Sequence, residues 1–319
     1  MEGRKPDRTP VSFWKHFPDA DHDPEQLAEA LVEFQRRYDL DFVKLMPSGM
    51  YGTEDFGCEA GDPDPETGAK RLLKGPISRV SDWAALRPVP PDRGARGREL
   101  RCLELVRRAL GPGVPIIQTV FSPSTTAAKI MGRDAFIAAA REHPEAIEGA
   151  LDMLAETEAA FARAAVDRGA DGIFFATQLA GDGLMTADEY RRFGVAYDMR
   201  VLEAIASRSW FSMVHVHGSN PLFSLFSSYP VPAISWHDRR TSPSLSEARD
   251  MWPGVFACGL DEWGVLRTGD PAAVRADVEA MIRQADPTRF ILAPGCVLPL
   301  DVPPENLEAV RGAVESSNP

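Results

Sequence analysis

The sequence has little positive charge relative to its acidic residues. Its 319 residues include 35 Lys and Arg against 47 Asp and Glu, which gives a formal net charge of −12 at pH 7. Nucleic-acid backbones and anionic membranes both select for basic surfaces. The composition therefore argues against either of them as the main partner and favours a small-molecule ligand.

Paired cysteines and long apolar runs are also missing. The four cysteines are scattered along the chain, which is typical of reduced thiols rather than of a disulfide framework. No stretch approaches the roughly 20 apolar residues that a membrane-spanning helix needs. Residues 1–10 are charged and lack the apolar core of a signal peptide. We therefore expect a soluble, cytoplasmic protein.

Short apolar segments alternate with amphipathic helical patterns along the whole chain. Helix starts are readable at Asp23-Pro24, at Pro144 and at Asp270-Pro271. Segments rich in Val, Ile and Phe are predicted strands, at residues 11–17, 41–46, 115–122, 171–178, 211–217, 233–238, 255–260 and 289–293. Eight strands separated by helices predict an α/β fold, a (β/α)8 TIM barrel formed by a single domain over residues 1–319.

The alternative architecture is an open, doubly wound sheet. A nucleotide-binding version of that fold would need a glycine-rich turn after an early strand, and the sequence has none. The barrel is therefore favoured. Two long loops are expected over its carboxyl-end mouth, at residues 47–94 and 122–143. Such loops bind ligands and form lids in barrels, although each could also be a variable, solvent-exposed loop without a role in binding.

Two histidines and a distant cysteine form the main candidate site. His215 and His217 are two residues apart, so they lie on the same face if the segment is a strand. Cys296 must join them through the fold. Nitrogen and thiolate ligands together suit zinc, and three protein ligands leave a fourth position for water or substrate. The alternative is a hydrogen-bonded histidine pair with a cysteine that packs as a small apolar residue.

Further polar residues lie where predicted strands end and should face the same rim of a barrel. Lys15, Lys44 and Gln178 are candidate substrate-binding residues, although each lysine could instead be a solvated surface charge. His237 could bind metal or donate a proton. Asp261 could orient a histidine ligand or cap the following helix. We assign His237 and Asp261 as the candidate catalytic residues.

Three segments carry a resemblance to a known family. Residues 10–14 (Pro-Val-Ser-Phe-Trp), residues 41–45 (Asp-Phe-Val-Lys-Leu), and Pro-Gly-Cys at 294–296 followed by Pro-Pro-Glu-Asn at 303–306 resemble uroporphyrinogen decarboxylase and its relatives. These relatives include cobalamin-dependent methyltransferases that move methyl groups to coenzyme M. The resemblance implies a (β/α)8 barrel with its site at the carboxyl-end mouth.

The decarboxylase branch of this family implies residues that the chain lacks. Those enzymes use an early arginine-rich loop and an aspartate after the second strand, without a metal. Here residues 14–17 read Trp-Lys-His-Phe, and residues 46–49 read Met-Pro-Ser-Gly. A substrate with eight carboxylates needs several fixed positive groups, so decarboxylation of uroporphyrinogen itself is disfavoured.

The methyltransferase branch fits better. The resemblance implies zinc held by a His-x-Cys pair on the fifth strand and by a cysteine after the last. This chain matches at His215 and Cys296, whereas His217 replaces the middle cysteine. Glu54 resembles the early acidic loop of that branch and is a candidate substrate-binding residue. With one thiolate instead of two, zinc keeps more positive charge, which favours a methyl donor or acceptor other than coenzyme M.

The leading hypothesis is a zinc-dependent methyltransferase or demethylase that moves a methyl group between a small molecule and a corrinoid (cobalamin). The chain lacks the Asp-x-His-x-x-Gly pattern of a corrinoid-binding module, so the corrinoid should be carried by a partner protein. A second hypothesis is a metal-independent carboxy-lyase in which Lys15, Lys44 and His237 hold a carboxylated substrate. A third is a non-catalytic barrel in which His217 marks decay of an older site.

Overall fold

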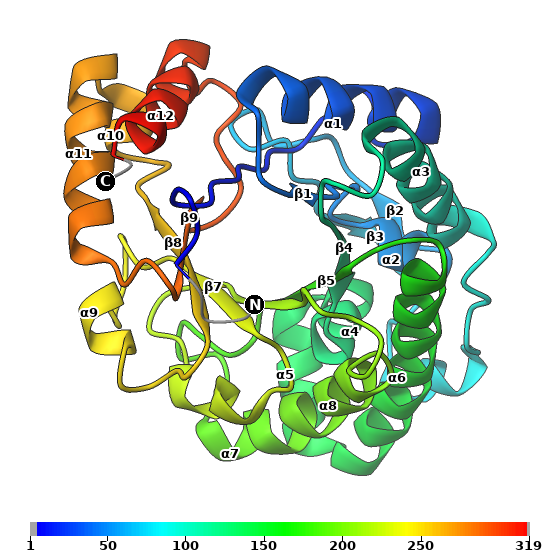
Figure 1. The fold of residues 1–319 in the computed structure, drawn as a ribbon. Coiled ribbons are helices and arrows are strands. Elements are labelled where there is room, and N and C mark those ends of the chain that lie inside the picture. Colours follow the sequence, from blue (N-terminus) through cyan, green and yellow to red (C-terminus); the bar gives the residue numbers. More distant parts are fainter. Residues whose placement is uncertain (1–4, 318–319) are drawn as a thin grey trace.

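A curled sheet of parallel strands forms the core of the fold, and helices surround it (Figure 1). The structure, a computed structural model, describes residues 5–317. Residues 1–4 and 318–319 of the predicted domain lie outside this range. The sheet has seven strands in the order β1 (Val43–Lys44), β4 (Ile116–Phe121), β5 (Gly172–Thr177), β6 (Met213–Val216), β7 (Ala233–Trp236), β8 (Val255–Leu260) and β9 (Phe290–Pro294).

The predicted first strand, residues 11–17, is not a strand. Val11 makes a single parallel bridge with Leu292 of β9, and its carbonyl accepts from the Asp41 N–H at 2.9 Å. The segment therefore lies between β9 and the start of β1, but no ladder continues past it. Further along, the Trp14 carbonyl accepts from the Leu298 N–H at 2.9 Å, in the loop beyond β9 rather than in a strand. In the described chain the sheet therefore has seven strands, and a full eight-strand barrel is not shown.

Side-chain caps begin several of the surrounding helices where the sequence predicts them. Asp23 and Asp270 each accept a backbone N–H from the first turn of the helix that follows. The helices of eight or more residues are α1 (Pro24–Tyr38), α3 (Gly94–Leu110), α4 (Pro123–Met131), α5 (Arg133–Glu142), α6 (Pro144–Asp167), α8 (Ala196–Glu203), α11 (Pro271–Gln284) and α12 (Pro304–Ser316). Shorter helical elements are α2 (Tyr51–Glu54), η1 (Val80–Ala85), α7 (Ala187–Tyr190), η2 (Arg191–Val195), η3 (Phe223–Ser228), α9 (Leu245–Ala248) and α10 (Val265–Thr268). Within residues 5–317, no helix has the length and apolar character that would let it cross a membrane.

The two expected long loops have different outcomes. Residues 122–143 are mostly helical, because Ser122 caps α4 by accepting from Thr125 N–H and Pro123 occupies the first turn. The prediction of a loop there is wrong, since the Ser and Thr residues are a helix start. Residues 47–94 are largely irregular, with only the short elements α2 and η1 and the hairpin β2 (Glu59–Ala60) and β3 (Leu72–Lys74).

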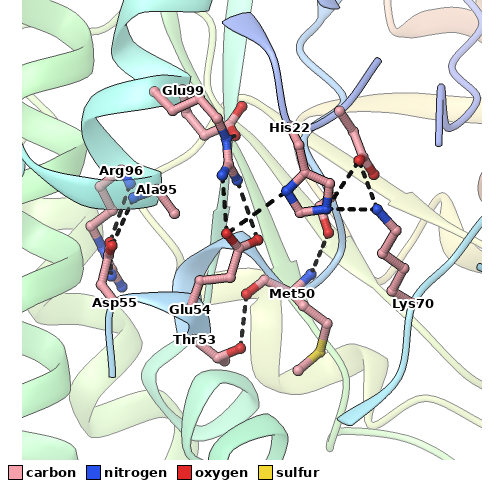
Figure 2. Close-up of polar contacts among 12 residues, drawn as sticks. His22, Met50, Thr53, Glu54, Asp55, Lys70, Ala95, Arg96 and Glu99 are labelled. Carbon is pink, nitrogen blue, oxygen red and sulfur yellow. Dashed lines mark hydrogen bonds and ion pairs between the residues drawn. The ribbon is translucent and has the colours of Figure 1, made fainter. Parts of the chain in front are cut away.

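A buried ion cluster anchors this long segment to the helices behind it. Arg96 on α3 is fully buried and pairs with Asp55, just after α2, at 3.3 Å and with Glu158 on α6 at 2.6 Å. Asp55 also accepts from the Ala95 N–H at 2.7 Å (Figure 2). Removing one partner of a buried pair leaves an uncompensated charge. The position of the segment that leads into the site therefore depends on Arg96.

We predict that Arg96→Met lowers the free energy of unfolding by about 3–5 kcal/mol, because Glu158 and Asp55 lose their counter-charge inside the protein. Urea unfolding followed by circular dichroism measures this. The control is Arg101→Met, whose partner Glu25 is exposed and whose loss should cost less than about 1 kcal/mol. Equal effects of the two substitutions would contradict the role of the cluster.

Candidate metal centre

Four potential metal ligands meet at the carboxyl ends of neighbouring strands. His215 lies on β6, His217 directly after it, His237 directly after β7, and Cys296 two residues after β9. One ligand atom from each residue lies within 4.8 Å of all the others. Cys296 Sγ is 3.8 Å from His215 Nε2 and 3.6 Å from His217 Nδ1. The structure therefore brings together the three predicted ligands and adds His237.

Burial determines the protonation state of these four side chains. Burial holds the pKa of His215 well below its ordinary value and lowers the pKa of His237 to about 4. The imidazoles are therefore neutral at pH 7, with a lone pair free to bind a cation. Burial raises the pKa of the Cys296 thiol to about 12, so a bound cation would have to displace its proton. Three imidazoles and one sulfur fit a zinc ion.

His237 has a defined orientation in this group. Its Nε2 lies 3.2 Å from His217 Nδ1, so this nitrogen points toward the other donors. Its neighbour Trp236 points away, and the indole N–H donates to the Pro243 carbonyl at 2.7 Å. The sequence left open which of these residues lines the site, and the structure assigns that place to His237.

Asp261 and its neighbour Glu262 have opposite orientations. Asp261 pairs with Arg240 and accepts from the Gly264 N–H at 3.1 Å, in the turn before α10; the N-cap of α10 is Gly264, and no side chain caps this helix. Glu262 is 1% exposed, and its Oε1 lies 3.8 Å from His237 Nδ1. Sequence reasoning missed Glu262. The alternation of side chains along an extended segment was the available signal, since neighbouring residues face opposite sides.

A cavity of about 220 Å³ lies beside the four donors, with aromatic and basic walls. Its lining residues in the described chain include no Asp or Glu. They are Trp14, His16, Lys44, Met46, Pro47, Gly49, Ala69, Lys70, Thr119, Phe121, Lys129, Phe174, Ala176, Gln178, His215, His217, Cys296 and Val297. Of the predicted substrate-binding residues, Lys44 and Gln178 are therefore at the cavity.

Lys44 is a buried lysine without a carboxylate partner among residues 5–317. Its Nζ contacts Met46 Sδ and lies 4.4 Å from the centre of the Phe174 ring. Burial lowers the pKa of Lys44 to about 7. Lys129, on α4, donates to the Gly49 carbonyl at 2.9 Å, and burial lowers its pKa to about 8. An anionic group in this cavity would compensate both desolvated ammonium groups.

Lys15 and Glu54 lie away from the donors. Lys15 lines a separate cavity with Phe34 and Arg37, and its Nζ is 5.6 Å from the centre of the Phe17 ring. Its neighbours Trp14 and His16 take the inner side. Glu54 pairs with Arg98 at 3.0 and 3.2 Å (Figure 2). Both side chains are thus engaged outside the cavity that Lys44 and Gln178 line.

A comparison with known families identifies the family of the chain. A family model described as Uroporphyrinogen decarboxylase (URO-D) matches residues 1–317. The chain belongs to the uroporphyrinogen decarboxylase family. The resemblance found in the sequence is confirmed.

Curated relatives in this family carry two kinds of name. The methylcobamide:CoM methyltransferase MtaA of Methanosarcina barkeri is 24% identical over 330 residues, covering 98% of this chain and 94% of MtaA. The methylcobamide:CoM methyltransferase MtbA of Methanosarcina acetivorans is 24% identical, covering 92% and 85%. The uroporphyrinogen decarboxylase of Hydrogenovibrio crunogenus is 25% identical, covering 86% and 73%.

A solved structure shares the fold of the chain. It is described as a methyltransferase from Methanosarcina mazei and superposes with a TM-score of 0.83 at 22% identity. The alignment covers 98% of this chain and 95% of that one. The likeness shows that the curled α/β fold extends over the whole family domain.

We predict that the protein binds one zinc or cobalt(II) ion through this group. Cys296→Ser should abolish the sulfur-to-cobalt charge-transfer absorption of the cobalt-loaded protein. His215→Ala should weaken zinc binding by more than about 100-fold. Removing the hydrogen-bond partner of a ligand already lowers metal affinity by roughly 10- to 100-fold, and removing the ligand itself should cost more. His143→Ala is the control, since His143 is exposed at a helix start. A cobalt spectrum unchanged by Cys296→Ser would show that the metal lies elsewhere.

Proposed function

We propose that this protein is a zinc-dependent methyltransferase or demethylase that moves a methyl group between a small molecule and a corrinoid. The observation that carries the proposal is the convergence of His215, His217, His237 and Cys296 at one edge of the sheet. The names of the relatives MtaA and MtbA support the corrinoid. We propose that a separate partner protein carries it, as the sequence suggests.

Within this proposal, three groups of residues have different roles. The three imidazoles and Cys296 would hold zinc, which when bound would activate a thiol or a leaving group as a Lewis acid. Trp14, Phe121 and Phe174 form an aromatic part of the cavity wall. Lys44 and Gln178 orient the small molecule beside the donors. Weakly hydrated surroundings strengthen each of these polar contacts.

His217 bears on the choice of methyl donor or acceptor. A zinc ion held by three neutral imidazoles and one thiolate keeps one unit of positive charge, more than a site with two thiolates would have. Such a centre acidifies bound groups more strongly, and a thiolate bound to it is less nucleophilic. We therefore propose an oxygen or nitrogen compound, rather than coenzyme M, as the methyl donor or acceptor.

The cavity limits the size and charge of that compound. At about 220 Å³ it is below the usual range of roughly 300–1,000 Å³ for ligand sites, and a tetrapyrrole needs far more room. Its lysines favour a compound with an anionic group. Because Lys44 is buried beside the donors and lacks a carboxylate partner in the described chain, we place that group at Lys44.

The second candidate function is a metal-independent carboxy-lyase. The observation in its favour is the same basic cavity, because Lys44 and Lys129 can hold a carboxylate without a metal. His237, beside the cavity, would then be the proton donor. This candidate leaves the clustering of Cys296 with three histidines without a role, and we rank it second for that reason.

The experiment that separates the two functions compares zinc-loaded and metal-stripped protein. With cobalamin and small methylated oxygen or nitrogen compounds, zinc-loaded protein should interconvert cob(I)alamin and methylcob(III)alamin, which absorbance records. His215→Ala should be inactive in this assay. Release of carbon dioxide from carboxylated compounds by metal-stripped protein, with no corrinoid turnover, would favour the carboxy-lyase.

We predict that Lys44→Met raises the KM for the anionic substrate by about tenfold or more, because a hydrogen bond to a charged group contributes roughly 1.5–3 kcal/mol. Initial rates over a range of substrate concentrations measure this. Lys15→Met is the matched control, since Lys15 lines a different cavity, and its KM should equal that of the wild type. Equal KM values for all three proteins would rule out Lys44 as the anchor.

A further inference from the structure

Glu262 lies between two of the candidate ligands because of the order of the strands. It follows β8 by two residues, and β8 lies between β7 and β9 in the sheet. His237 follows β7, and Cys296 follows β9. One side chain from the middle strand can therefore reach the loops on both sides. Its side chain is 1% exposed, so both carboxylate oxygens must find their partners within the protein.

One oxygen of Glu262 holds the turn that presents Cys296. Its Oε2 accepts from the Gly295 N–H at 3.1 Å. Gly295 also lies close to the other loop, since a Cβ added there would be 3.0 Å from His237 Cα and 3.2 Å from the Trp236 carbonyl oxygen. The loops after β7 and β9 thus approach each other closely at Gly295, where Glu262 binds the backbone.

The other oxygen of Glu262 faces His237. Oε1 is buried without a hydrogen-bond partner and lies 3.8 Å from His237 Nδ1. The opposite nitrogen of the ring, Nε2, faces the other donors through His217. A proton on Nδ1 would point at the free carboxylate oxygen and would leave the lone pair of Nε2 for a cation. A shift of the ring by about 1 Å would bring Nδ1 within hydrogen-bond distance and satisfy the buried oxygen.

We infer that Glu262 is a positioning residue for the metal centre, which fixes the tautomer and orientation of His237 and, through Gly295, the approach of Cys296. The inference rests on the proposed function, since it concerns the zinc that this function requires. Glu262 acts through other residues and does not itself touch the metal. Its neighbour Asp261 has no such role, because it pairs with Arg240 on the outer side.

Zinc affinity, measured by competition with a chromophoric chelator, tests this inference without any need for catalysis. Glu262→Gln should weaken zinc binding by about 10- to 100-fold, the usual effect of removing a carboxylate behind a histidine ligand. Asp261→Asn should bind zinc as tightly as the wild type. Circular dichroism and the urea midpoint should show that Glu262→Gln is folded. A folded Glu262→Gln protein with wild-type zinc affinity would overturn the inference.

A double-mutant comparison shows whether Glu262 acts through His237. Within the His237→Ala protein, a further Glu262→Gln change should weaken zinc binding much less than it does in the wild type, because the residue that it orients is absent. Fully additive losses would contradict the role assigned to His237. The cobalt(II) ligand-field spectrum should also shift in Glu262→Gln and stay unchanged in Asp261→Asn.

The outcomes for the inference and for the proposed function are distinguishable. A wild-type protein that binds zinc through Glu262-supported His237 but turns over no corrinoid would overturn the proposed activity and leave the inference standing. If the protein is a zinc-dependent methyltransferase and Glu262→Gln changes neither its zinc affinity nor its cobalt spectrum, the inference is overturned and the proposed activity stands. Each measurement therefore decides one of the two statements.

Discussion

The site depends on one geometric constraint, which is that seven parallel strands end on the same side of a curled sheet. Cys296 and His215 are 81 residues apart in sequence, yet their side chains lie 3.8 Å apart. No local interaction could produce this. Because neighbouring strands are hydrogen-bonded in register, the ends of β6, β7 and β9 cannot move independently. The ladder holds the four donors close to one another, and the burial that the sheet provides keeps the imidazoles neutral.

The sequence predicted the parts of the fold that follow from repeated patterns, and the exceptions have specific physical causes. Apolar runs located the seven strands, and caps such as Asp23 and Asp270 located the helices that follow them. Residues 11–17 have the composition of a strand, but the Trp14 carbonyl bonds to a loop, a long-range contact that no local pattern encodes. At residues 122–143, the Ser and Thr residues indicate a loop by composition and a helix cap by position.

Within the candidate site, the sequence predicts which side chains share a face on a strand, but not which of two adjacent residues faces the site in a loop. His215 and His217 share a face because they are two residues apart on one strand. Beyond the strand ends the sequence no longer determines which neighbour points inward. Two adjacent pairs illustrate this: His16 rather than Lys15 lines the cavity, and Glu262 rather than Asp261 faces His237. The side that each residue faces is decided by the path of the loop, which depends on tertiary contacts.

The long segment between β1 and α3 is held by several side-chain contacts, among them those of Asp55 with Arg96 (Figure 2) and of Lys70 with the buried Asp21. It contributes Gly49, Ala69 and Lys70 to the cavity wall, whereas the four donors come from the carboxyl ends of β6, β7 and β9. Part of the cavity wall and the candidate metal ligands therefore come from different parts of the chain. A change in the path of this segment would reshape the wall while the strand ends kept the ligand geometry fixed.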